Sequence, residues 1–154
     1  MKRGISFEIP NECGTFLGDV LKPIDITDFI WQVSNEESYL EVNNKLDEEL
    51  FPEEKKVMPG TELKNLLENN VYYIIFADLK AYPKEKISEI ATYEEFIEND
   101  CELVLLVVDS CYTTIYCKDK EKLELLYRNA QAYRFKDVQY VTDKNDTRTG
   151  LTVW

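Results

Sequence analysis

The chain has 154 residues, and its hydrophobic content of 44% with 12% aromatic residues is that of a globular protein rather than a disordered one. Thirty acidic residues against 18 basic ones give a net charge of −12, so the surface repels nucleic-acid backbones and anionic membranes. The absence of histidine excludes Ser-His-Asp and Cys-His catalytic systems. We expect one domain that spans residues 1–154.

Signals for export, membrane insertion and metal binding are missing from the sequence. The basic start of the chain reaches Glu8 before an apolar run develops, which argues against a signal peptide. The longest apolar runs, residues 71–77 and 103–108, are far shorter than the ~20 residues that cross a bilayer. The four cysteines form no CxxC pair, so we expect free thiols, no metal site and no cofactor in a cytoplasmic protein.

The first part of the chain contains two strand signals of different kinds. Alternating apolar residues over 2–10 predict a half-buried strand. A short helix follows, with Asn11 as its candidate cap and Pro23 at its end, and its apolar members are Phe16, Leu17, Val20 and Leu21. Two apolar runs, 29–33 and 39–42, are separated by the polar segment Ser-Asn-Glu-Glu-Ser, which predicts a β-hairpin. Residues 47–59 are acidic, contain proline and have no clear period, so we expect mainly a surface loop there.

Helix signals frame the middle of the chain. Thr61 is the predicted cap of a helix that ends near Asn69-Asn70. The continuous apolar run over residues 71–77 then predicts a strand that is covered on both faces. Thr92 and Glu95 stand three residues apart, which is the spacing of a capping box at the start of a short helix.

The last part of the chain has the clearest order of elements. We predict a strand over 103–108, a tight turn, a strand over 111–117, a helix over about 120–133 and a strand over 138–142, with a further edge strand at 151–154. The whole pattern predicts an α+β fold with a single mixed, largely antiparallel sheet and helices packed against it. The order of strands in the sheet does not follow from the sequence.

The acidic residues are unevenly distributed along the chain. Residues 119–154 carry 7 basic and 6 acidic residues, so the net charge of about −13 belongs to the first 118 residues. Residues 36–54 hold the densest acidic stretch, with Lys45 as their single basic residue. Solubility alone is one explanation of this charge, and recognition of a basic protein is the other. In the second case the binding residues are Glu36, Glu37, Glu41, Asp47, Glu48, Glu49, Glu53 and Glu54.

A second group of candidates lies after the apolar runs. Asp78 and Asp109 each follow such a run, and carboxylates at the ends of central strands often line clefts. Lys80 comes just after Asp78, and Arg148 lies in the polar loop 143–150, where we expect Asp143 or Asp146 to hold it. Aspartate after a strand is equally the ordinary chemistry of turns and helix caps. The weak catalytic candidates are therefore Asp78, Lys80, Asp109 and Arg148.

Four segments resemble an uncharacterised family from Bacillus-like Gram-positive bacteria that is classified as a domain of unknown function. They are the opening MKRGISFEIP, the run IFADLKAYP at residues 75–83, residues 103–118, and the ending DTRTGLTVW at residues 146–154. The likeness covers nearly the full length. It implies a bacterial cytoplasmic protein, and it implies no activity, ligand or catalytic residue.

Two functional hypotheses from different classes follow. The leading one is a non-enzymatic, acidic protein-binding module, immunity-like or adaptor-like, that recognises a basic protein and neither nucleic acid nor membrane. The alternative is a small-molecule-binding protein or enzyme with a cleft near the four candidate residues named above. A nucleic-acid mimic is a third class, and it requires carboxylates spaced like phosphates. The sequence favours a binding function over catalysis, and it indicates no oligomeric state.

Overall fold

A computed structural model describes residues 1–34, 37–51, 56–84, 87–146, 148 and 150–153. In these ranges nine strands form one sheet, and all of their pairings are antiparallel. The strands are β1 (Lys2–Glu8), β2 (Ile30–Val33), β3 (Glu37–Val42), β4 (Lys45–Glu49), β5 (Val57–Pro59), β6 (Tyr72–Tyr82), β7 (Leu103–Val108), β8 (Tyr112–Cys117) and β9 (Lys136–Thr142). The helices are α1 (Phe16–Leu21), α2 (Gly60–Glu68), α3 (Tyr93–Glu98) and α4 (Lys120–Ala132), with a 3₁₀ turn, η1, at Ile26–Asp28. The predicted α+β class with a largely antiparallel sheet is confirmed.

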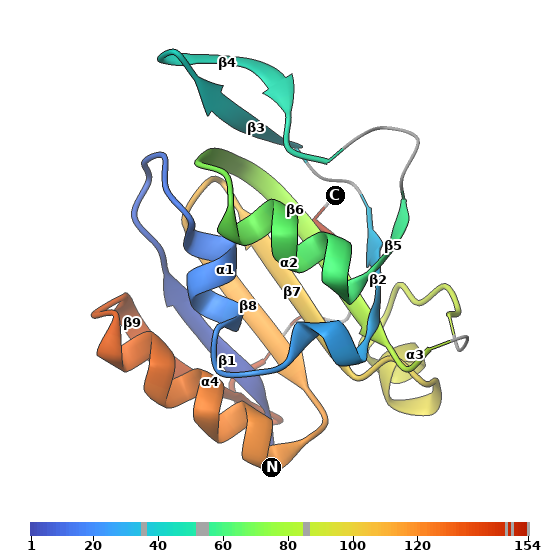
Figure 1. The fold of residues 1–154 in the computed structure, drawn as a ribbon. Coiled ribbons are helices and arrows are strands. Elements are labelled where there is room, and N and C mark those ends of the chain that lie inside the picture. The colour runs from blue at the N-terminus through green and yellow to red at the C-terminus, as the bar shows by residue number, and fades with distance from the viewer. Residues whose placement is uncertain (35–36, 52–55, 85–86, 147, 149, 154) are drawn as a thin grey trace.

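Helices cover both faces of this sheet, although unequally. The strand order is β4-β3-β6-β7-β8-β1-β9, with β2 also paired to β6, and β5 beyond β2. Helices α1, α2 and α4 lie over one face, where the larger hydrophobic cluster forms (Figure 1). Helix α3 and the end of the chain cover part of the other face, where Phe96 and Leu151 pack against Leu106 and Tyr116 in a smaller cluster. The sheet therefore has two buried faces over its central strands.

The predicted hairpin between residues 29–33 and 39–42 is wrong. Strand β2 pairs with β6 from Ile30↔Tyr82 to Val33↔Leu79, and β3 continues along the same edge of β6 from Glu37↔Phe76 to Leu40↔Tyr72. The chain does not reverse between β2 and β3, because both strands find their partner in the 11-residue strand β6. The two runs therefore pair with one strand, β6, and not with each other.

The reversal occurs later, at Asn43-Asn44. Both asparagines have positive φ, 53° and 62°, which is the conformation of a tight hairpin turn and one that asparagine tolerates. Strand β4 then returns along β3, and β5 returns along β2. The prediction of a surface loop over residues 47–59 is therefore wrong at both of its described ends, where β4 and β5 form. The alternation of apolar and polar residues that marks a strand is missing from β4, because all five of its residues, Lys45–Glu49, are exposed at the edge of the sheet.

Local capping signals predicted the helix starts with mixed success. The Thr92 hydroxyl accepts a hydrogen bond from the Glu95 backbone N–H, so the predicted cap is confirmed. Glu95 Oε1 reaches one residue farther back than in a regular capping box and accepts from the Ala91 N–H. Helix α2 starts at Gly60 rather than behind a Thr61 cap. A Cβ at Gly60 would lie 1.9 Å from the carbonyl oxygen of Ile26, so only glycine fits where α2 packs against η1.

The end of the chain contains no strand among residues 150–153, contrary to the predicted edge strand. Leu151 is instead buried, and its N–H donates to the carbonyl of Ala91. Gly150 forms an isolated antiparallel bridge with Thr92. Trp154, the last residue of the predicted strand, lies outside the described residues. The segment therefore serves as a cover for the second face of the sheet.

Candidate functional site

Strand β6 places two charged side chains inside the protein. Asp78 and Lys80 lie on the same face of β6, and they are 0% and 2% exposed. Their neighbours Leu79 and Ala81 alternate with them and join the core under the helices on the opposite face. The expectation that Asp78 follows its strand is wrong, because β6 continues beyond it, pairing with β2 through residues 79–82 and with β7 through residues 77–81.

The two charges form an ion pair that leaves one carboxylate oxygen without a partner. The ammonium nitrogen of Lys80 donates to Oδ1 of Asp78 at 2.5 Å. Oδ2 of Asp78 is buried and accepts no hydrogen bond from any described residue. A buried acceptor without a donor is costly, typically about 1–3 kcal/mol and more for a charged group. Such an oxygen calls for a functional explanation.

Burial dominates the protonation of Asp78. Removal of the carboxylate from water raises the pKa of Asp78, and the charge and hydrogen bond of Lys80 act in the opposite direction. Other groups near this site behave similarly. Burial raises the pKa of the Tyr82 hydroxyl, and it raises the pKa of Cys101 to about 12. The site is therefore a poorly hydrated environment in which charged interactions are strong.

A pocket of about 360 Å³ opens onto the Asp78–Lys80 pair. This volume lies in the lower range of small-molecule sites. Four parts of the chain meet there: the end of β2, strand β6, the segment that leads into α3, and the residues near the C-terminus. The lining residues are Gln32, Ser34, Asp78, Lys80, Glu89, Ile90, Ala91, Glu95 and Thr152. We call this site the Asp78–Lys80 pocket.

The pocket lies beside the end of the pairing between β2 and β6. Regular pairing with β6 stops at Val33, and the Ser34 N–H then donates to the carbonyl of Asp78. Pairing resumes at Glu37. Gln32 and Ser34 therefore sit at the end of β2 directly beside the ion pair, and Glu95 approaches from α3 on the same side of the sheet.

The structure brings together only two of the four residues in the predicted cleft. Asp109 is exposed in the turn between β7 and β8, with a φ of 52°. Because Leu106 pairs with Asp78, Asp109 lies three residues farther along, about 10 Å at the rise of a strand. Arg148 lines a separate hollow with Tyr116 and Asp146. Neither Asp109 nor Arg148 lines the Asp78–Lys80 pocket.

Asp146 holds Arg148, as predicted, through the backbone, because its Oδ1 accepts a hydrogen bond from the Arg148 N–H at 3.1 Å. Both predicted aspartates also contact a second arginine. Arg3 Nε donates to Asp143 at 2.7 Å, and Arg3 Nη1 donates to Asp146 at 3.3 Å. The guanidinium also lies 4.1 Å from the ring centre of Tyr93. The expectation for Arg148 missed this contact because Arg3 is 140 residues away from Asp143 and reaches it only through the pairing of β1 with β9.

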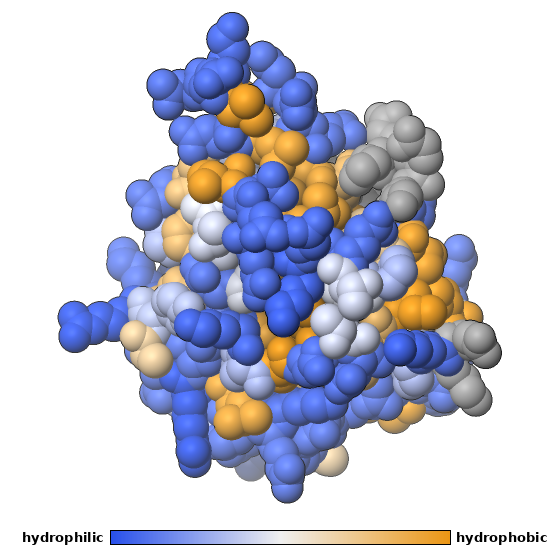
Figure 2. Space-filling view, viewed as in Figure 1, coloured by the Kyte–Doolittle hydropathy of each residue, from blue (hydrophilic) through white to orange (hydrophobic). Residues whose placement is uncertain are grey.

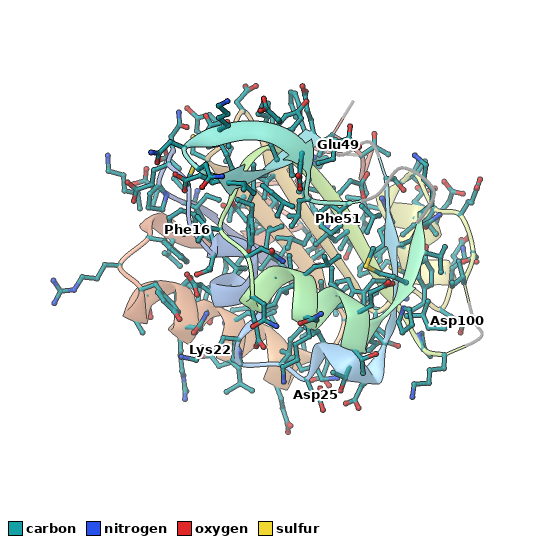
Figure 3. All side chains as sticks on the ribbon, turned by 45° about the horizontal axis from the view of Figure 1, so that its top comes forward. Phe16, Lys22, Asp25, Glu49, Phe51 and Asp100 are labelled. Atoms are coloured by element: carbon teal, nitrogen blue, oxygen red, sulfur yellow. The ribbon has the colours of Figure 1, made fainter. Side chains whose placement is uncertain are left out.

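The acidic candidates lie on a hairpin that projects from the body. Glu37 and Glu41 belong to β3, while Asp47, Glu48 and Glu49 are exposed on β4 at the edge of the sheet. Figure 2 shows mainly hydrophilic residues on this hairpin at the top of the molecule. In Figure 3, Glu49 lies on the hairpin while Phe51, which is 1% exposed, lies beneath it. The other three acidic candidates, Glu36, Glu53 and Glu54, fall outside the described residues.

The hairpin and the pocket are separate features. No residue of β4 lines the Asp78–Lys80 pocket. Among the described residues no ion pair involves Glu41, Asp47, Glu48 or Glu49, and no three His, Cys, Asp or Glu side chains are grouped to hold a metal. The described helices include none that is both long and apolar enough to span a membrane.

Sequence reasoning missed most of the pocket. Gln32 carries a weak signal, because it is a polar residue between the buried Trp31 and Val33. Glu95 was identified only as part of the capping box, and one of its oxygens does serve that role. Glu89 and Thr152 carry no local signal, since only the folding of the chain onto the second face of the sheet brings them to the pocket.

Comparison with known proteins gives a family without a known activity. Residues 2–152 match the family described as "Protein of unknown function (DUF2691)". The chain is 49% identical to the "Uncharacterized protein YncE" of Bacillus subtilis (strain 168), over 99% of this chain and 100% of that protein. No solved structure matches the chain. The chain belongs to the DUF2691 family, as the resemblance of its four segments to a family of unknown function predicted.

Proposed function

We propose that this protein binds a small polar molecule in the Asp78–Lys80 pocket and that binding, rather than catalysis, is its activity. The observation that carries the proposal is Oδ2 of Asp78, a buried carboxylate oxygen that has no hydrogen-bond donor among the described residues. A ligand that donates a hydrogen bond to this oxygen removes the cost of its isolation.

The composition of the pocket supports this proposal. Small-molecule sites combine a concave shape with a few convergent polar groups. Here the buried ion pair forms the charged part, Gln32 and Ser34 contribute an amide and a hydroxyl group, and Ile90 contributes apolar surface. A buried ion pair is weak evidence for stability, because well-packed apolar residues often serve stability equally well or better. The pair is therefore better explained by a ligand than by the fold.

A thermal-shift experiment with a matched variant tests the proposal. Wild type and the double variant Asp78→Leu/Lys80→Met are screened against small amines, small carboxylates and neutral polyols or amides at millimolar concentration. A bound ligand raises the melting temperature in proportion to the logarithm of its concentration over Kd. We expect at least one class to raise the melting temperature of wild type only. If no class does so, or if both proteins respond equally, the proposal is wrong.

A second candidate function rests on the edge position of β4. All five residues of β4 are exposed, and β4 ends the strand order, with no described strand beyond it. Open strand edges pair readily with another chain, and acidic side chains on the edge favour a basic partner while they repel a second copy of themselves. This observation favours recognition of a basic protein in the bacterial cytoplasm through the hairpin of β3 and β4.

Two charge-neutralised variants test this second candidate. The hairpin variant carries Asp47→Asn, Glu48→Gln and Glu49→Gln. The control variant carries Glu94→Gln, Glu98→Gln and Asp100→Asn, which are three exposed positions at or just after α3. A partner that co-purifies with wild type and the control variant but not with the hairpin variant supports the candidate. Equal capture by all three proteins, or by none, contradicts it.

A further inference from the structure

The charges that surround the Asp78–Lys80 pocket narrow the class of its ligand. Among the described residues that line the pocket, three carry a carboxylate, Asp78, Glu89 and Glu95, against the ammonium group of Lys80. Asp78 and Lys80 are fully buried, Glu95 is half-buried and Glu89 is exposed at the rim. The charge of the lining is therefore negative, in a setting where burial weakens the screening by water.

Lys80 is poorly placed to offset this charge for an anionic ligand. Its ammonium group already donates to Oδ1 of Asp78, so its positive charge is compensated within the pair. An anion in the pocket would also face Glu95 and Glu89 without a second cation among the described lining residues. Repulsion between the anion and these carboxylates opposes binding, and the low local dielectric strengthens this repulsion.

The hydrogen-bonding groups lead to the same conclusion. Oδ2 of Asp78 needs a donor, and a charged donor forms a stronger bond with a carboxylate than a neutral one does. Glu95 directs Oε1 toward the backbone N–H of Ala91, and its carboxylate also lines the pocket. A protonated amine is a compact donor of several hydrogen bonds, so it supplies the donor that Oδ2 of Asp78 lacks. Its positive charge also offsets the negative charge of Glu95.

We propose that the ligand is a small molecule with a protonated amine, which donates to Oδ2 of Asp78 while its charge is balanced by Glu95 and Glu89. This inference rests on the proposed function of the pocket and adds the chemical class of its ligand. In this arrangement the Lys80 ammonium donates to Oδ1 of Asp78 and the ligand's amine donates to Oδ2.

Three four-carbon probes of matched length test the class: 1,4-diaminobutane, 1,4-butanediol and succinate. Isothermal titration at one pH and one ionic strength measures their affinities for the full chain. We expect 1,4-diaminobutane to bind at least about tenfold more tightly than the diol, since a charge-assisted hydrogen bond replaces a neutral one. Succinate is expected to show no binding.

Two single variants on α3 separate the pocket from the general acidity of the protein. Glu95→Gln removes a charge from the pocket and retains the capping box, because glutamine serves the same capping role. Glu94→Gln removes a charge from the exposed neighbouring position, which does not line the pocket. We expect Glu95→Gln to weaken binding of 1,4-diaminobutane by about three- to tenfold and Glu94→Gln to leave it unchanged. Equal effects would show non-specific attraction of cations and would overturn the inference.

The outcomes distinguish a failure of the ligand class from a failure of the pocket. If succinate or butanediol binds more tightly than diaminobutane, and Asp78→Leu/Lys80→Met abolishes that binding, the pocket is a ligand site and the amine assignment is wrong. If none of the three probes binds and the wider thermal-shift screen is also negative, both proposals fail. Diaminobutane binding that persists in the double variant would place the amine elsewhere and overturn the inference.

Discussion

The backbone N–H of Ser34 donates a 3.0 Å hydrogen bond to the carbonyl of Asp78, which places the break in the pairing of β6 beside the buried ion pair. Before this bond the chain pairs as β2, and after the break it pairs as β3 along the same strand. Gln32 and Ser34, which precede this break, line the Asp78–Lys80 pocket.

The buried pair gives a stability prediction that separates structural from functional roles. Lys80→Met leaves the Asp78 carboxylate buried without its cation, and loss of one partner of a buried pair costs ~3–5 kcal/mol of unfolding free energy. The double variant Asp78→Leu/Lys80→Met removes both charges, and we expect its stability to equal or exceed that of wild type. Urea unfolding of the three proteins measures the difference. A double variant as unstable as the single one would show that the pair is needed for the fold itself.

The contact between Arg3 and Asp143 predicts a dependence of stability on pH. The hydrogen bond from Arg3 is the main cause that holds the pKa of Asp143 below its ordinary value. The carboxylate therefore contributes stability at pH values above its ordinary pKa, and this contribution is lost as the pH falls through the lowered pKa.

Unfolding experiments on wild type and Asp143→Asn between pH 7 and pH 2 check this dependence. We expect wild type to be the more stable protein at neutral pH and the difference to shrink as the solution becomes acidic. Sodium chloride should also reduce the difference, because the contact is exposed to solvent. A difference that stays constant over the whole pH range would contradict the prediction.

Two glycines should be intolerant of substitution for a steric reason. A Cβ at Gly4 would lie 1.9 Å from the carbonyl oxygen of Ile115 on β8, and a Cβ at Gly60 would lie equally close to that of Ile26. Because both contacts are with backbone, we expect Gly4→Ala and Gly60→Ala each to cost about 1–3 kcal/mol or more. Gly150→Ala is the matched control, since its Cβ would contact Ala91 at 3.8 Å. Thermal or urea unfolding should show the control within about 0.5 kcal/mol of wild type.

The four free thiols should react in two classes. Cys13 and Cys111 are partly exposed, whereas Cys101 and Cys117 are buried. Burial raises the pKa of Cys101 to about 12 and that of Cys117 to about 11, so few reactive thiolates form at these positions.

Reaction of the native protein with Ellman's reagent at pH 8 measures these classes. We expect two fast thiols and two slow ones, with all four reacting at once in guanidinium chloride. Serine variants of Cys13 and Cys111 should each remove one fast thiol. Four fast thiols in the native protein would contradict the burial of Cys101 and Cys117.

The sequence by itself determined those features whose causes are local. The cap formed by Thr92 with Glu95, and the tight turn after the strand over residues 103–108, at Asp109-Ser110, each depend on residues close together in the sequence, and both are present. The positive φ angles of Asn43 and Asn44 belong to the same class. Such a pair of asparagines is a local signal for a hairpin turn.

Only the tertiary structure decided which strands pair and which side chains meet. Strands β2 and β3 both pair with β6, about 40 residues farther along the chain, rather than with each other. The choice between these two pairings depends on the burial of whole strands rather than on local preference. Asp78 and Lys80 are neighbours in the sequence, but their burial, and the approach of Glu95 and Thr152, depend on how the end of the chain covers the second face of the sheet. The residues that line the pocket range from Gln32 to Thr152 in the sequence, and no local pattern encodes such a meeting.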